Sequence, residues 1–300
     1  MMRILVCTKR DLAGAIVLNQ LMPHLAGDRV MVLLSDKTRP AEKSLPELAE
    51  MKFLERDLPI DTLFPLVDSL GAEGAPLATF DGIAARYGVP MKTVSKINSA
   101  DGEALVRDFA PDLILSVRFS LIFKQPIFDI PRLGTWNVHP GALPRYAGLF
   151  APFRSMLDGQ SHIGCTLHRI DDGIDTGPVV GIGWLPVDRR RSLLWHVVRA
   201  YQPGLDLFVT MLAGLRQGRQ PDLMTQDSTQ RVYVSMPADE HFRAFHASGL
   251  RLSDPDEYRD IIRGFLPVDL DIPEAIAAAL QPSTTAGFDK VEASCCCARA

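Results

Sequence analysis

Short apolar runs alternate with a helical pattern along the first part of the chain. Between the first two runs, apolar residues recur at helical spacing from Asp11 to Leu21, and Pro23 ends the pattern. The runs are apolar on both faces, as buried parallel strands are. This alternation predicts an α/β fold with a Rossmann-like, mostly parallel sheet and helices on both faces. The runs are RILVC (3–7), RVMVLLS (29–35), PDLILSVRF (111–119) and LGTWNVH (133–139).

The connection between residues 36 and 98 is longer than a simple crossover between two parallel strands. Its pattern predicts several elements of its own, and Ser99, a preferred N-cap residue, marks the start of the next helix. The predicted elements are a charged helix near 46–57, a helix near 79–87 ended by Gly88, a short strand PMKTVS (90–95) and a helix from Ser99 to Phe109.

The following part of the chain predicts a strand pair and a broken helix. HIGCTLHRI (162–170) and GPVVGIGWLPV (177–187) flank the turn DDGIDTG as two neighbouring strands. A long helix is predicted from about 192 to 218, and the Pro-Gly pair at 203–204 should kink or break it.

Composition changes after residue 218, which predicts three regions. They are a large domain over 1–218, a small and mainly helical appendage over 219–280, and a disordered tail over 281–300. The tail holds Cys295, Cys296 and Cys297, and adjacent cysteines do not easily form disulfides that stabilise a fold. The appendage has helical patterns near 238–247, 255–265 and 273–280.

The composition is that of an ordinary globular protein. The 300 residues are 47% hydrophobic and carry a net charge of −4, without the basic excess typical of nucleic-acid-binding proteins. No apolar run approaches the roughly 18 residues of a membrane helix, and the start does not have the pattern of a signal peptide. Cys7 and Cys165 lie inside predicted strands, as small buried hydrophobic residues do. We expect a cytoplasmic protein that binds neither nucleic acid nor membrane.

Several common site motifs are missing from the sequence. The turn after the first strand reads TKRDLAG, without a G-x-G-x-x-G dinucleotide motif, and neither a P-loop nor a G-x-S-x-G elbow occurs. In HIGCTLH, His162 and His168 share a strand face but Cys165 does not, so three convergent metal ligands are not expected. DDGIDTG has Ile182 where a calcium loop requires Glu. We expect no metal site.

The stretch NVHPGALPRYAG (137–148) carries the strongest chemical signal. Asn137 and His139 have the same strand parity at the carboxyl end of a predicted parallel strand, where ligands bind in open α/β sheets. An Asn amide donates to an oxyanion, and a His polarises the same oxygen or moves a proton. With Asp175 nearby, this set suits acyl transfer to a nitrogen nucleophile. The alternative is an Asn that ends a strand, a capping His, and an Asp175 that only holds a turn.

NVHPGALPRYAG followed by HRIDDGIDTGPVV resembles the formyltransferases that use 10-formyltetrahydrofolate. The resemblance spans about residues 1–218 and implies a formyltransferase catalytic domain there. It matches Asn137, His139 and Asp175 to the catalytic Asn, His and Asp of the family. His168 matches a further active-site His found in part of the family.

The resemblance also implies a folate site. SVRFSLIF (116–123) is similar to the segment whose backbone groups bind the pterin ring. The alternative is that its apolar side chains simply belong to the hydrophobic core. No metal is implied. The folate-binding residues that we expect are Phe119, Leu121, Ile122, His168, Asp171 and Gly173.

The sequence departs from three branches of this family. Glycinamide ribonucleotide formyltransferases bind phosphate with a Gly-Ser-Asn turn, where this chain reads KRDLAG. Methionyl-tRNA formyltransferases add a basic, β-rich barrel, whereas 219–280 is predicted to be helical and is rich in acidic residues. Formyltetrahydrofolate hydrolases have a preceding regulatory domain that the N-terminus here does not resemble.

The branch that remains acts on small biosynthetic amines, with nucleotide-linked amino sugars as the best-known acceptors. The expected partners are therefore folate and a small-molecule amine, in a pocket that the insertion 36–98 helps to shape. We also expect a homodimer. The alternatives are a hydrolase, a methionyl-tRNA formyltransferase-like enzyme and a folate-binding protein without catalytic activity.

Overall fold

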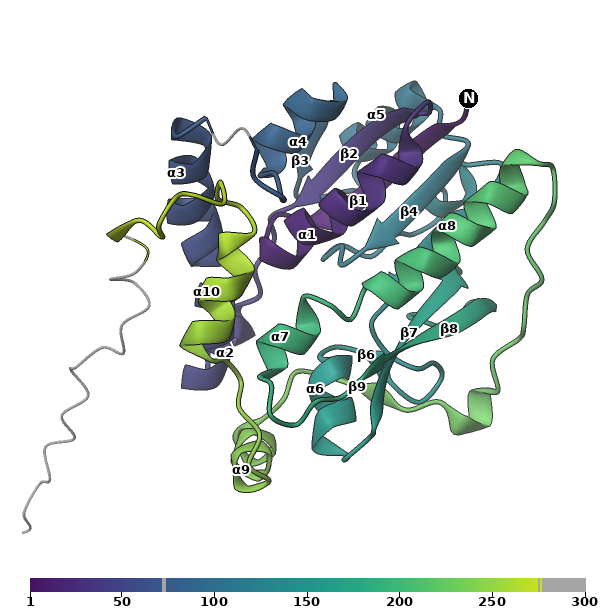
Figure 1. Cartoon of the computed structure of the whole chain (residues 1–300). Coiled ribbons are helices and arrows are strands. Elements are labelled where there is room, and N and C mark those ends of the chain that lie inside the picture. Colours follow the sequence, from purple (N-terminus) through teal and green to yellow (C-terminus); the bar gives the residue numbers. More distant parts are fainter. Residues whose placement is uncertain (72–73, 275, 277–300) are drawn as a thin grey trace, which may run out of the picture.

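The computed structural model describes residues 1–71, 74–274 and 276, and its centre is one seven-stranded sheet (Figure 1). The strand order is β3-β2-β1-β4-β5-β7-β8, in which the first five strands are parallel and β7 pairs antiparallel with both β5 and β8. The predicted Rossmann-like α/β fold is thereby confirmed. The strands are β1 (Arg3–Lys9), β2 (Arg29–Ser35), β3 (Met91–Val94), β4 (Leu113–Val117), β5 (Thr135–His139), β7 (His162–Arg169) and β8 (Val179–Pro186).

Helices cover both faces of the sheet. Alternate residues of β1 point to opposite faces, so Ile4 and Val6 join one apolar core and Leu5 and Cys7 join the other. Helices α1 and α8 lie side by side over the first face, and α5 packs against the second. The helices are α1 (Leu12–Leu21), α2 (Pro46–Lys52), α3 (Phe64–Ser69), α4 (Phe80–Tyr87), α5 (Ala100–Phe109), α6 (Ala151–Leu157), α7 (Leu193–Val197), α8 (Gln202–Arg216), α9 (Asp239–Ala247) and α10 (Pro255–Arg263).

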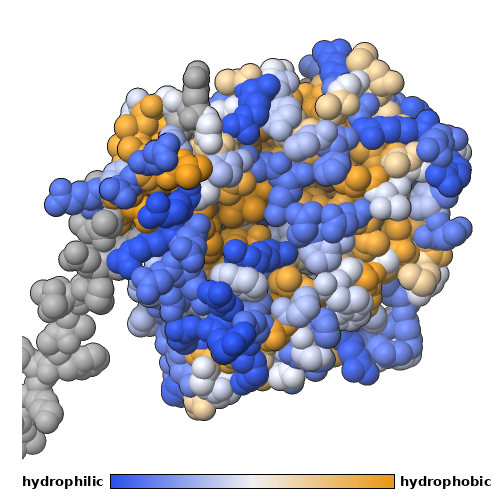
Figure 2. Space-filling model, viewed as in Figure 1, coloured by the Kyte–Doolittle hydropathy of each residue, from blue (hydrophilic) through white to orange (hydrophobic). Residues whose placement is uncertain are grey.

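The outer surface of these layers is largely polar. Figure 2 shows hydrophilic side chains over most of the visible face, with apolar side chains between them. The amphipathic helices turn their apolar sides to the sheet. None of the helices in the described part of the chain combines the length and the apolar character needed to span a bilayer.

Local capping explains why the predicted helices begin and end where they do. Thr79 accepts a hydrogen bond from the Gly82 amide at the start of α4, and Ser99 does the same for α5 through Gly102. Gly88 ends α4 with a φ of +62°, a left-handed conformation that glycine adopts without steric cost. Helix α4 in the 36–98 insertion and helix α5 after it confirm the predicted pattern, and β3 confirms the short strand at 90–95.

The predicted helix 192–218 is two helices in the structure. Helix α7 ends at Val197, and Pro203 lies in the first turn of α8, where its missing N–H costs nothing. The predicted break is therefore confirmed. The sequence pattern missed α3 and α6, which are only 6 and 7 residues long. The predicted tail 281–300 and nearly all of the predicted helix 273–280 lie outside the described residues.

The chain after α8 returns to the carboxyl edge of the sheet. There β9 (Tyr233–Val234) pairs with β6 (Ala147–Gly148) in a separate two-stranded sheet. Helix α9 then packs against α6, where the rings of Phe153 and Phe245 stack with centroids 4.7 Å apart. Helix α10 is tied to α7 by the buried Glu257, whose carboxylate accepts from the Ser192 hydroxyl at 2.6 Å.

Candidate active site

A cavity of about 360 Å³ opens at the carboxyl ends of β1, β4 and β5. This volume lies within the usual range for small-ligand sites. The strand order reverses between β1 and β4, and ligands of open α/β sheets bind at such a switch point. The cavity is lined on one side by the end of β5 and the loop after β7, and on the other by the end of β1 and the 36–98 insertion.

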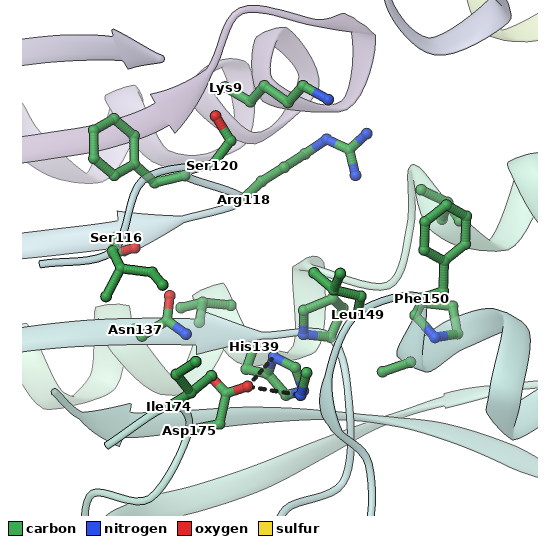
Figure 3. A pocket seen from close by; sticks show the side chains of 18 of the residues that line it. Lys9, Ser116, Arg118, Ser120, Asn137, His139, Leu149, Phe150, Ile174 and Asp175 are labelled. Atoms are coloured by element: carbon green, nitrogen blue, oxygen red, sulfur yellow. Dashed lines mark hydrogen bonds and ion pairs between the residues drawn. The ribbon is translucent and has the colours of Figure 1, made fainter. Parts of the chain in front are cut away.

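The three polar residues that the sequence predicts for the chemistry, Asn137, His139 and Asp175, lie on one wall of the cavity (Figure 3), and His168 lines the same cavity. Asn137 on β5 lies opposite His168 on β7, and the Asn137 Nδ2 atom is 3.1 Å from His168 Nε2. The Asp175 carboxylate lies between two imidazoles, with its oxygens 3.7 Å from His139 Nδ1 and 3.6 Å from His168 Nε2. The strand parity and the turn therefore place these side chains as the sequence indicates.

The hydrogen bonds of the two imidazoles define their proton positions. His168 Nδ1 lies 2.9 Å from the Arg169 carbonyl, which only accepts, so this nitrogen carries the proton. In neutral His168, Nε2 then accepts from the Asn137 amide, whose second N–H is left for a ligand. His139 Nε2 donates to the Tyr146 carbonyl at 2.6 Å, which turns Nδ1 toward Asp175. Both nitrogens of His139 thus face protein oxygens.

The Asp175 carboxylate is held in its charged form. Its burial raises the pKa, but the neighbouring His139 and His168 and a hydrogen bond from the Gly148 amide, at 2.8 Å, lower the pKa well below its ordinary value. Asp175 has a φ of +54°, a left-handed conformation that Asp tolerates better than most residues. A side chain at Gly148 would meet the Val234 carbonyl at 2.2 Å, so the close approach of β9 requires glycine there.

The predicted folate segment forms a second, apolar wall. Phe119, Leu121 and Ile122 all line the cavity, and Phe119 stacks on Phe123 with ring centroids 5.2 Å apart. Ile122 is 56% exposed and lies at the rim. Its carbonyl accepts from the Asn98 amide at 2.7 Å, which ties this loop to the start of α5. The three apolar residues are therefore placed to contact a ring in the cavity.

The other predicted folate residues occupy different positions. Asp171 and Gly173 line the cavity, but the Asp171 carboxylate accepts from the Gly173 amide at 3.2 Å and from the Thr176 hydroxyl at 2.7 Å. It therefore shapes the turn that carries Asp175. His168 lies in the polar cluster beside Asn137. Its expected contact with folate remains a prediction.

Sequence reasoning missed a charged wall on the far side of the cavity. Arg118, at the end of β4, has a φ of +59° and donates from Nε to both Asp11 oxygens at 2.9 Å. The same guanidinium donates to the Tyr201 hydroxyl at 3.2 Å and to the Glu55 carboxylate. Burial lowers the pKa of Arg118, but Asp11 and Tyr201 raise the pKa by more than burial lowers it, so the guanidinium stays charged. The only signal was one arginine inside the apolar run SVRFSLIF.

The network around Arg118 closes the N-terminus of α1. Asp11 is fully buried and caps that helix by accepting from the Gly14 amide at 2.9 Å. In many α/β proteins this helix terminus binds a phosphate group. Here the Asp11 carboxylate already occupies that position, and Arg118 neutralises it.

Two further cations on this wall have weaker partners. The Lys9 ammonium lies 3.8 Å from Asp11 and 4.0 Å from Glu42, beyond hydrogen-bond distance, and burial lowers its pKa. The guanidinium of Arg39 makes no ion pair or hydrogen bond with any residue in the described ranges, although Arg39 also lines the cavity. In contrast, Arg56 is paired with Asp36 at 2.6 Å.

Comparisons with known proteins agree with this fold. Residues 61–193 match the family described as formyl transferase. The chain is 34% identical over 152 residues to the methionyl-tRNA formyltransferase of Kosmotoga olearia. This matched region covers 51% of this chain and 49% of that protein. The chain thus spans about half the length of the curated relatives it matches.

Two solved structures share the fold at low identity. A 4-N formyltransferase from Francisella tularensis is 16% identical, with a TM-score of 0.52, over 78% of this chain and 76% of that one. An N-formyltransferase from Helicobacter canadensis, in complex with folinic acid and dTDP-3-aminofucose, is 17% identical, with a TM-score of 0.50, over 78% and 71%. The family match confirms the resemblance to formyltransferases, and the two structures show the same fold.

Proposed function

We propose that this chain, whose residues 61–193 match the formyl transferase family, moves a formyl group from 10-formyltetrahydrofolate to the primary amine of a small biosynthetic substrate. The observation that carries the proposal is the meeting of Asn137, His139 and Asp175 at the cavity, opposite an apolar wall that suits a pterin ring. This arrangement supplies a hydrogen-bond donor, an imidazole and a fixed negative charge around one reacting carbon.

The reaction forms one bond and breaks another at the formyl carbon. The acceptor nitrogen attacks this carbon, and the carbonyl oxygen takes the electron pair and becomes an oxyanion. The second N–H of Asn137 donates to that oxygen, and a protonated His139 adds positive charge beside it. The amine then loses a proton, the bond to the folate nitrogen breaks, and that nitrogen receives a proton.

We assign Asp175 an electrostatic role in these steps. Because His139, His168 and the Gly148 amide lower the pKa of Asp175, its carboxylate is a weak base and keeps a proton poorly. It places a negative charge beside His139 and helps to move the amine proton toward the departing nitrogen. His139 faces the Tyr146 carbonyl and Asp175, so Asn137 is the more direct donor to the oxyanion.

The acceptor that we propose carries an anionic group as well as the amine. Lys9 and Arg39 line the cavity and have weaker partners than Arg118 or Arg56, so they are available for a carboxylate or phosphate. Nucleotide-linked amino sugars are anionic amines of this kind and are our first choice. Asp11 caps α1, so the phosphate groups would bind these two side chains rather than that helix terminus.

Methionyl-tRNA is the second candidate acceptor, because the curated relatives that match half of this chain are methionyl-tRNA formyltransferases. An acceptor screen separates the candidates. The protein is incubated with 10-formyltetrahydrofolate and amino-sugar nucleotides, amino acids, ornithine derivatives or methionyl-tRNA. Mass spectrometry then detects replacement of an amine hydrogen by CHO. Donor consumption that no amine accelerates would instead indicate a hydrolase.

A further inference from the structure

The segment 222–236, here called the C-terminal strap, follows α8 and includes β9, which lies beside β6 (Figure 1). Met224 exchanges two backbone hydrogen bonds with Val179, both at 2.8 Å. The strap then pairs with the segment that holds Tyr146 and Gly148, since the Leu149 amide donates to the Val234 carbonyl at 2.9 Å. The strap therefore contacts both backbone segments that surround Asp175, and it lies beyond the matched family region 61–193.

Gln226 is the inward-facing residue in the first part of the strap. Of residues 222–230, all except Gln226 are exposed. Its Nε2 atom donates to the Asp175 carbonyl at 3.0 Å and to the Gly177 carbonyl at 2.7 Å. Carbonyl oxygens only accept, so the amide nitrogen must face the loop. The Gln226 Oε1 atom is buried without a partner in the described residues, a cost that the two donated bonds offset.

These two bonds hold the backbone on either side of Thr176. Asp175 is in a left-handed conformation, which costs free energy and persists only where the surroundings impose it. Its carboxylate must meet three groups at once, namely His139, His168 and the Gly148 amide. A shift of the Asp175 backbone would disturb all three contacts together. The position of the carbonyl thus determines the position of the carboxylate.

We propose that Gln226 is a positioning residue that fixes Asp175 for catalysis, so that the strap is an integral part of the active site. This inference rests on the proposed function. It assigns no contact with substrate to Gln226, which acts only through the loop 173–177. Misplacement of a reacting group by about 1 Å costs up to roughly a hundredfold in rate. Loss of the clamp should therefore lower kcat and leave the binding of the formyl donor unchanged.

Two variants of the full chain test the clamp. Gln226→Met keeps the length of the side chain but has no donor, and Gln226→Glu keeps the shape but, when ionised, presents only acceptors to the two carbonyls. Gln230→Ala is the matched control, because Gln230 belongs to the same strap, is exposed, and its side chain hydrogen-bonds only to Asp227 among the described residues. The readouts are kcat, the KM for 10-formyltetrahydrofolate, and hydrogen exchange of the amides in 173–179.

We expect kcat to fall about tenfold to a hundredfold in both Gln226 variants, with an unchanged donor KM and faster exchange confined to 173–179. Gln230→Ala should match the wild-type protein in all three. Unchanged kcat in both Gln226 variants would overturn the inference, and so would faster exchange throughout the sheet, which indicates general destabilisation. If the wild-type protein formylates nothing, the proposed function fails, and exchange at 173–179 still reports on the clamp.

Discussion

The two polar walls of the cavity are built in different ways. The formyl wall, with Asn137, His139, His168 and Asp175, comes from adjacent strands and one turn, and Asn137 and His168 are 31 positions apart. On the charged wall, Arg118 meets partners 107, 63 and 83 positions away, in Asp11, Glu55 and Tyr201. The residues of the formyl wall all lie within positions 137–175 of the sequence. The second exists only once the sheet order and the insertion have brought its parts together.

The walls also differ in which of their polar groups can still bind a ligand. The formyl wall has a carboxylate held beside two imidazoles and an amide with one N–H remaining. We assign it the chemical step, so its variants should lower kcat. On the charged wall, Lys9 and Arg39 are the weakly paired cations, and we assign them acceptor binding, so their variants should raise KM.

The largest expected effect follows Asp175→Asn, which removes the charge between the two imidazoles. By analogy with an Asp→Asn change beside a catalytic His, kcat should fall on the order of 10³ to 10⁴-fold. Folate binding, measured by quenching of protein fluorescence, should persist. Asp172→Asn, in the same turn but exposed and outside the cavity lining, should have wild-type activity. Wild-type kcat in Asp175→Asn would remove Asp175 from the mechanism.

Asn137→Ala should come next, because it deletes the most direct donor to the oxyanion. The loss of one such donor typically lowers kcat about a hundredfold or more. Steady-state kinetics with both substrates should show a fall in kcat and little change in either KM. If only the acceptor KM rises, Asn137 positions the acceptor and the oxyanion role is wrong.

On the charged wall, Lys9→Met and Arg39→Gln should act on binding. A hydrogen bond to a charged group contributes about 1.5–3 kcal/mol, so the KM for an anionic acceptor should rise roughly tenfold or more in each variant. The kcat at saturating acceptor should stay near the wild-type value. Lys37→Met is the control, since Lys37 is exposed and outside the cavity lining. Equal KM values in all three variants would mean that the acceptor binds elsewhere.

The smallest effect concerns pH. Since the pKa of Asp175 is lowered in the folded protein, its ionised form contributes stability above the unfolded pKa, about 3.9, and this is lost as pH falls through the folded pKa. Urea unfolding of wild type and Asp175→Asn should show a free-energy difference that is steady near pH 5 and shrinks in more acidic solution. If the difference in unfolding free energy instead grows as the pH falls, folding raises the pKa of Asp175 and the assigned direction is wrong.

The sheet and the formyl wall could be predicted because their signals are local. Buried strands are continuous apolar runs, and strand parity puts Asn137 and His139 on the same face. Arg118 and Gln226 had no comparable signal. Arg118 is explained by a network between four segments of the chain, and Gln226 looks like any polar residue in an exposed loop until its two carbonyl partners are seen.

The most direct test of the central claim is the release of tetrahydrofolate from 10-formyltetrahydrofolate, followed with and without the amine acceptor that the screen identifies. We predict release that depends on the amine in the wild-type protein and is lost in Asp175→Asn, although that variant still binds folate. Release at the same rate without the amine, or in Asp175→Asn, would contradict formyl transfer by this site.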